Sequence, residues 1–198
     1  MATFSDLMTN GFGIVTVMNA KVYEALTDFT GKTAAAIVAE PGEKLCSLDT
    51  LKIANVTMEG PNKTITGGRY SNPLIKFGKS ARLEMQDALG KGEAIAALCG
   101  GIKEGDGTIT GLHFGENFVG PKMIIGDSFF IDRNSGSQVP VTIVFYQFLP
   151  DSIFNLTQDA EGDATVFDMN GDLLTTEITI DGEKHGVFYS IIETTSKE

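Results

Sequence analysis

ARLEMQ, the sequence at residues 81–86, alternates apolar and polar side chains with a period of two. In an extended chain its apolar positions, Ala81, Leu83 and Met85, share one face. Such alternation is typical of a β-strand that buries one face and exposes the other. We therefore predict a half-buried strand here, with its apolar face in the core.

Similar segments recur along the chain and are separated by residues that favour turns. We expect further strands at residues 50–58, 108–114, 122–131, 140–148, 152–157, 164–168, 177–180 and 186–193. The turn sequences between strands are Asp106-Gly107, Ser135-Gly136, Glu161-Gly162-Asp163, Asn170-Gly171-Asp172 and Asp181-Gly182. This pattern predicts a mainly β, antiparallel architecture.

One short helix is expected at residues 92–99, GEAIAALC. Ile95, Leu98 and Cys99 recur at helical spacing, and the following Gly100-Gly101 is a favourable helix end. Residues 21–29 fit either a second helix or a strand followed by a turn.

Length and composition indicate one globular domain over residues 1–198. The chain has 26 acidic and 15 basic residues, a net charge of −11. It contains no apolar run of the roughly 18 residues that a membrane span needs, and no secretory signal is visible. Cys46 and Cys99 are expected to be buried free thiols.

The charge is unevenly distributed. Residues 1–100 carry ten acids and ten bases, whereas residues 101–198 carry sixteen acids and five bases. Nine carboxylates and no Lys or Arg lie between residues 151 and 183. Such a stretch repels phosphate, which argues against nucleic-acid binding there. A solvated acidic face that aids solubility explains the same residues.

A basic segment at residues 60–79, GPNKTITGGRYSNPLIKFGK, contains four basic residues and no acid. It joins two expected strands, and we predict a long hairpin or loop that contacts another copy of the chain. Its candidate contact residues are Lys63, Gly67, Gly68, Arg69, Lys76 and Lys79.

We find no complete catalytic or cofactor-binding motif in the sequence. Gly31-Lys32-Thr33 and Gly78-Lys79-Ser80 lack the leading glycine of a phosphate-binding loop. The two histidines, His113 and His185, are isolated. Residues 168–172 resemble part of a calcium loop, but Thr179 occupies the position that requires Glu, so an Asn-Gly turn is the simpler interpretation. We expect no enzyme, cofactor or metal site.

Two segments resemble a known family. LKIANVTMEGPNKTITGGRYSNPLIKFGKSARLEMQDAL, at residues 51–89, looks like the tail tube (major tail) proteins of long-tailed bacterial viruses. Residues 140–174, with Pro150-Asp151 and ATVFDMNGDLL, are similar to a later pattern of the same family. Together they cover under half of the chain. Residues 1–50 are less familiar and would form an N-terminal arm or added strands.

The resemblance implies a two-sheet β-sandwich and a structural protein of the virion. Its copies would form hexameric rings that stack into a hollow tube, meet other tail proteins at the tube ends and let DNA pass without specific binding. Assembly would take place in the host bacterial cytoplasm, and no membrane binding is implied. The candidate acids facing the bore are Asp159, Glu161, Asp163, Asp168 and Asp172.

Two alternatives remain open from the sequence. A connector or a capsid-decorating protein would share the assembly role without an open bore. A carbohydrate-binding or carbohydrate-cleaving β-sandwich would use the acids differently, although no spacing selects a catalytic pair and the chain contains no Trp.

Overall fold

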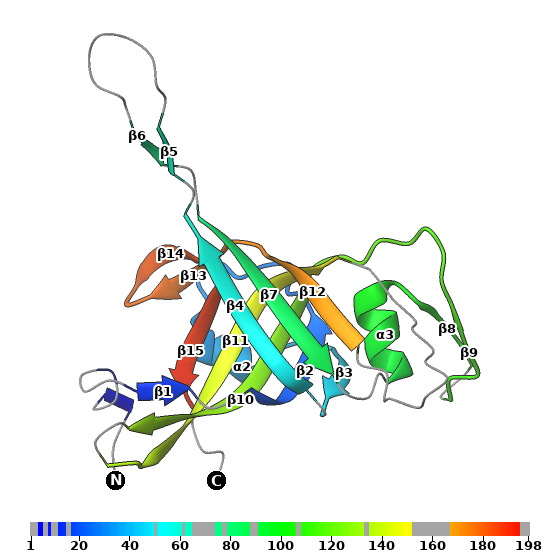
Figure 1. The fold of residues 1–198 in the computed structure, drawn as a ribbon, viewed down its shortest axis with the longest axis horizontal. Coiled ribbons are helices and arrows are strands. Elements are labelled where there is room, and N and C mark those ends of the chain that lie inside the picture. The colour runs from blue at the N-terminus through cyan, green and yellow to red at the C-terminus, as the bar shows by residue number, and fades with distance from the viewer. Residues whose placement is uncertain are drawn as a thin grey trace.

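The protein is mainly β, as predicted, with a large antiparallel sheet and smaller hairpins (Figure 1). The computed structural model describes residues 4–5, 8, 12–14, 17–49, 51–60, 62–64, 74–76, 79–87, 91–105, 108–132, 135–151 and 167–194.

Two long strands, β10 (Lys122–Asp132) and β11 (Gln138–Pro150), form the centre of the large sheet. Their connection has Gly136 at φ 66°, a left-handed conformation that suits glycine, and the Gly136 amide donates to the Asp132 carbonyl at 2.8 Å. The predicted Ser135-Gly136 turn is therefore confirmed. Both strands bury residues on both faces, which is why they read as nearly continuous apolar runs.

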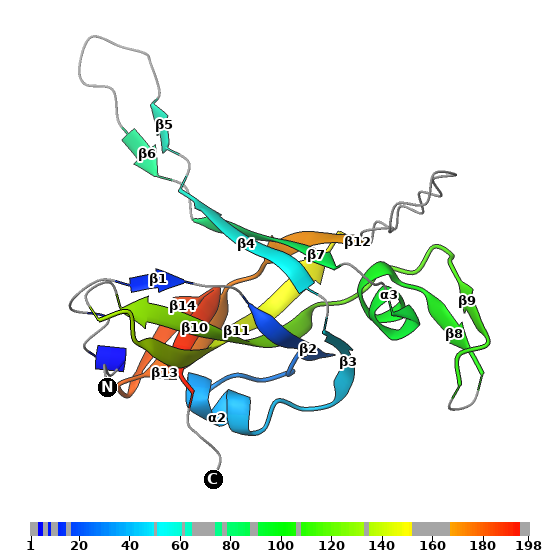
Figure 2. The same ribbon diagram turned by 60° about the horizontal axis from the view of Figure 1, so that its bottom comes forward.

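The large sheet folds over to give the two layers of a β-sandwich (Figure 2). Its main strand order is β3 (Lys44–Leu48), β2 (Met18–Glu24), β10, β11, β12 (Phe167–Leu173), β7 (Ser80–Asp87) and β4 (Leu51–Glu59). The early part of β11 pairs with β15 (Tyr189–Glu193), whereas its last residues pair with β12 (Phe167–Leu173). The second layer consists of β12, β7 (Ser80–Asp87) and β4 (Leu51–Glu59).

The N-terminal residues add strands to the first layer. Both β1 (Phe12–Ile14) and β2 (Met18–Glu24) pair antiparallel with β10, along successive parts of the same edge. Beyond β2 lies β3 (Lys44–Leu48). Residues 21–24 therefore belong to a strand and not to a helix, as one of the two interpretations of residues 21–29 predicted.

The predicted helix is present as α3 (Gly92–Cys99), and it ends at Gly100 in the left-handed conformation. A second helix, α2 (Ala34–Ala39), was not predicted. Its N-terminus is capped by Thr33, whose hydroxyl accepts from the Ala36 amide at 3.3 Å. With only six residues, α2 is too short for its periodicity to stand out.

The principal hydrophobic core lies between the layers and includes Leu83, Met85 and Leu98. The alternation that predicted β7 is confirmed, because Ala81, Leu83 and Met85 are all buried. A second core lies on the other face of β10 and β11, where Ile37 of α2 packs with Tyr146 and Ile178.

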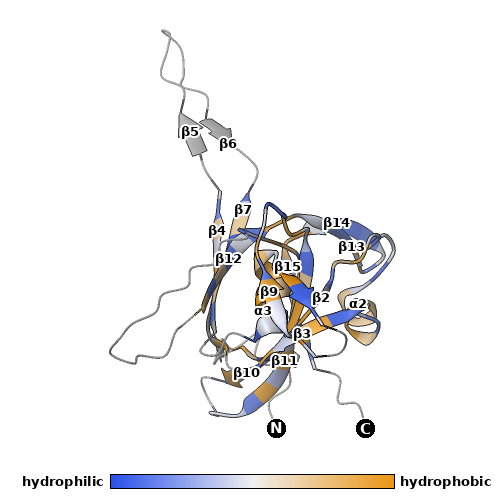
Figure 3. Ribbon diagram, turned by 90° about the vertical axis from the view of Figure 1, so that its right-hand side faces the viewer, coloured by the Kyte–Doolittle hydropathy of each residue, from blue (hydrophilic) through white to orange (hydrophobic). Residues whose placement is uncertain are grey.

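The smaller hairpins complete the fold. They are β5 (Asn62–Thr64) with β6 (Leu74–Lys76), β8 (Ile102–Glu104) with β9 (Gly111–His113), and β13 (Thr176–Ile180) with β14 (Glu183–Val187). The predicted turn between β13 and β14 is confirmed, with Asp181 at φ 52° and Gly182 at φ 84°. Strand β14 is mostly exposed and largely hydrophilic (Figure 3), whereas β13 buries Thr176 and Ile178.

Several details of the prediction were wrong. Asn170-Gly171-Asp172 is not a turn but lies inside β12, where Gly171 is buried against β11. The strand expected at residues 108–114 is limited to β9, and the one expected at 186–193 is divided between β14 and β15. The strand expected at 152–157, most of that at 164–168, and the turns at 106–107 and 161–163 lie outside the described residues.

Candidate functional site

The outer face of the second layer is the most distinctive surface of the described residues. No described element covers the outward side chains of β4, β7 and β12, and Figure 2 shows this layer on the opposite side of the molecule from α2. Alternate residues of each strand point away from the core, and the described side chains at these outward positions are polar. They are Asn55, Thr57, Glu59, Arg82, Glu84, Gln86, Asp168, Asn170 and Asp172, and we call them, with adjacent Asp151, the acidic face.

The acidic face carries five carboxylates and one guanidinium among its described side chains, which leaves a net charge of −4. Gln86 Nε2 donates to Asp168 Oδ1 at 3.0 Å, linking β7 to β12. No described residue forms an ion pair with Glu59 or Glu84. Their charges are therefore directed to solvent and contribute to a negative field above the sheet.

Arg82 is the only cation among the described side chains of the acidic face. Its Nη1 donates to Asp172 Oδ1 at 3.2 Å, and its Nη2 forms an ion pair with Asp151 Oδ2. The hydrogen bond with Asp151 is the main cause that raises the pKa of Arg82 above its ordinary value. These contacts join β7, the end of β11 and β12 at the fold between the two layers.

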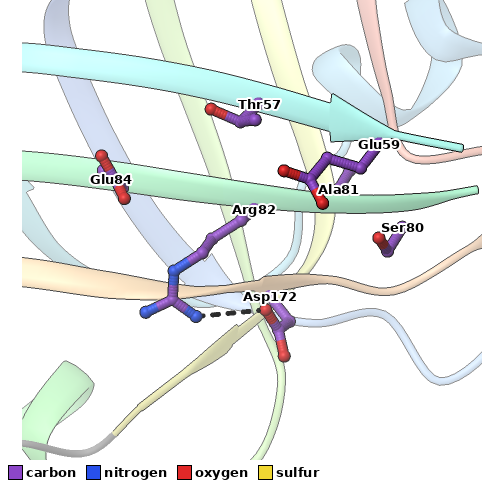
Figure 4. A pocket seen from close by; sticks show the side chains of 7 residues that line it. All are labelled: Thr57, Glu59, Ser80, Ala81, Arg82, Glu84 and Asp172. Atoms are coloured by element: carbon purple, nitrogen blue, oxygen red, sulfur yellow. Dashed lines mark hydrogen bonds and ion pairs between the residues drawn. The ribbon is translucent and has the colours of Figure 1, made fainter. Parts of the chain in front are cut away.

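A shallow groove on the acidic face runs beside Arg82 (Figure 4). Its lining includes Thr57, Glu59, Ser80, Glu84 and Asp172. Figure 4 shows the Arg82 guanidinium directed toward Asp172. Arg82 also lines the groove, but three carboxylates outnumber its single positive charge, so the net charge of the lining disfavours anions.

The predicted acids are only partly described. Asp168 and Asp172 lie exposed on β12 and belong to the acidic face, whereas Asp159, Glu161 and Asp163 lie outside the described residues. Sequence reasoning missed Glu59 and Glu84. The alternation of residues 81–86 places Glu84 on the polar face of its strand, but only the pairing of β7 with β12 shows that this face also carries Asp168 and Asp172.

The predicted basic hairpin is present where the structure describes it. β5 and β6 pair antiparallel, with Lys63 opposite Ile75 and Asn62 opposite Lys76, and they lie beyond the ends of β4 and β7 (Figure 1). Lys79 is exposed just before β7. Gly67, Gly68 and Arg69 lie outside the described residues.

The remaining reactive groups are not assembled into a site. His113 Nε2 lies 3.0 Å from Glu104 Oε2 on the exposed β8–β9 hairpin, far along the chain from His185. Burial raises the pKa of Cys46 to about 11 and also raises that of Cys99. In the described part of the chain, no three His, Cys, Asp or Glu side chains are grouped to hold a metal ion. Within the same residues, no helix has the length and apolar character to cross a membrane.

No protein-family model matches the chain, and no curated protein matches it significantly.

Proposed function

We propose that this chain is a structural virion protein that self-assembles into stacked hexameric rings and forms the hollow tail tube of a long-tailed bacterial virus. The sequence resemblance of residues 51–89 and 140–174 suggests this role. The main structural support is that β4 and β7 contribute to two surfaces. Their outward side chains belong to the acidic face, and their ends lead into the β5–β6 hairpin.

In this proposal the acidic face lines the bore. Duplex DNA carries one negative charge per roughly 1.7 Å of its axis, and basic walls would hold it by releasing counterions. A wall with a net charge of −4 per copy among its described side chains would repel the duplex instead. Because the copies repeat around and along the tube, modest fields add to a strongly negative interior.

The basic segment, in turn, is proposed to join copies. Its four bases and no acid contrast with a chain of net charge −11, so attraction to a neighbouring copy is favoured. Single exposed ion pairs contribute only about 0.2–1 kcal/mol, but sixfold repetition in each ring multiplies them. The other expected partners are the tail proteins at the tube ends, with assembly in the bacterial cytoplasm.

Electron microscopy of the purified protein tests this function. Hexameric rings or open tubes are the expected result. Rings or shells without an open bore would favour a connector or a capsid-decorating protein. Monomers that bind glycans on an array would overturn the proposal in favour of a carbohydrate-binding domain.

A further inference from the structure

Arg82 is the one described group of the acidic face that is chemically suited to hold a phosphate. A guanidinium is planar and always charged, and it binds phosphate oxygens with two parallel hydrogen bonds. The Arg82 side chain is 41% exposed, so an anion in solution can approach it. An unoccupied arginine here would give a polyanion a point of attachment on an otherwise repulsive surface.

The donors of Arg82 are already engaged. Nη1 lies 3.2 Å from Asp172 Oδ1 and 3.5 Å from Asp151 Oδ1, while Nη2 is bound by Asp151 Oδ2. The two carboxylates come from different segments: Asp151 directly follows β11, and Asp172 lies within β12. A phosphate would have to displace a carboxylate that the sheet holds in place, whereas a free arginine needs to lose only water.

We propose that Asp151 and Asp172 keep Arg82 from binding phosphate, so that the acidic face does not retain a polyanion. The inference rests on the proposed function only for the identity of that polyanion, which is the DNA passing through the tube. Arg82 thereby joins three strands at the fold of the sandwich without giving DNA a place to bind.

A general negative field would also weaken phosphate binding, and the structure offers a matched comparison. Asp151→Asn with Asp172→Asn removes two charges that contact Arg82. Glu59→Gln with Glu84→Gln removes two charges from the same face that have no ion-pair partner among the described residues. Both double variants change the net charge by +2, so they differ in the local pairing of Arg82.

Equilibrium dialysis of each full-length variant against tripolyphosphate at low ionic strength tests the inference. We expect D151N/D172N to bind the probe about fivefold more tightly than E59Q/E84Q, since an exposed ion pair has about this effect on an equilibrium. Adding Arg82→Gln to D151N/D172N should abolish the gain, and added salt should weaken it. Near-ultraviolet circular dichroism identifies any variant that has lost its fold. If the double variant does not fold, Asp172→Asn alone, which keeps Asp151, is tested instead, and we expect it to bind tripolyphosphate with an intermediate gain in affinity.

Equal binding by the two double variants would overturn the inference, because the general charge would then explain the effect. A gain that survives Arg82→Gln, or no gain in either D151N/D172N or D172N, would overturn it as well. Failure of the proposed function is a separate result, because microscopy can show no rings or tubes while dialysis still separates the variants.

Discussion

Gly171 of β12 lies so close to Leu149 of β11 that a Cβ atom on residue 171 would stand 2.2 Å from the Leu149 carbonyl oxygen. The same atom would lie 2.7 Å from the Phe148 ring. In the ladder Gly171 is opposite Pro150, at the point where β11 leaves the first layer and pairs with the second. Gly171 therefore permits close contact between two strands and is not part of a turn.

Gly171→Ala should lower the free energy of unfolding by about 1–3 kcal/mol, the usual cost of forcing extra volume into a packed interior. Denaturant unfolding of the purified variant measures this loss. Gly120→Ala is the matched control, because a Cβ there meets nothing within 4 Å, and it should stay within about 0.5 kcal/mol of wild type. Equal stability of the two variants would contradict the close packing at Gly171.

The error at Gly171 shows where sequence reasoning ends. Asn-Gly is a strong local turn signal, yet burial against Leu149 is a tertiary property that no local pattern reveals. By contrast, the alternation at 81–86 and the Gly100 helix end were interpreted correctly because both depend on neighbouring residues alone. The acidic face could be recognised only from the pairing of β7 with β12, whose partner residues are at least eighty positions apart in the chain.

Leu83→Ala should cost about 2–5 kcal/mol of stability, because Leu83 is fully buried between the layers and truncation leaves a cavity. Such a loss could approach the whole stability of an isolated subunit. Met58→Ala, on the adjacent strand with a 50% exposed side chain, is the control and should cost far less. A Leu83→Ala loss under about 1 kcal/mol in denaturant unfolding would show that the strand face is misassigned.

The stability of the protein should fall as the pH rises from about 9 toward about 11, in part because of Cys46. Burial raises the pKa of this thiol from 9.0 to about 11 in the folded state. The unfolded chain therefore loses the proton first, and rising pH favours unfolding. Cys46→Ala should reduce this slope in unfolding experiments between pH 8.5 and 10.5, and an unchanged slope would contradict the assignment. At pH 8, Cys46 should react with a thiol reagent only after unfolding.

Deletion of residues 64–71 should leave a folded subunit that no longer forms tubes, because the basic hairpin is proposed to join copies. Circular dichroism checks the fold and electron microscopy checks assembly. Lys184→Gln, on the exposed strand β14, is a control for loss of a basic residue elsewhere and should assemble normally. Tubes of normal length from the deletion variant would rule out this role for the hairpin.

Charge reversal on the acidic face tests whether that face lines the bore. Glu84→Lys with Asp168→Lys should leave tube assembly intact and slow DNA ejection, because paired lysines repeated along the tube would bind the duplex by releasing counterions. Added salt should relieve the slowing, since screening weakens these contacts. The matched control, Glu40→Lys with Glu43→Lys, makes the same charge change on exposed residues beside α2, across the sandwich from the acidic face. If the control slows ejection and the acidic-face variant does not, the α2 side faces the bore and the acids of β7 and β12 lie on the outside of the tube.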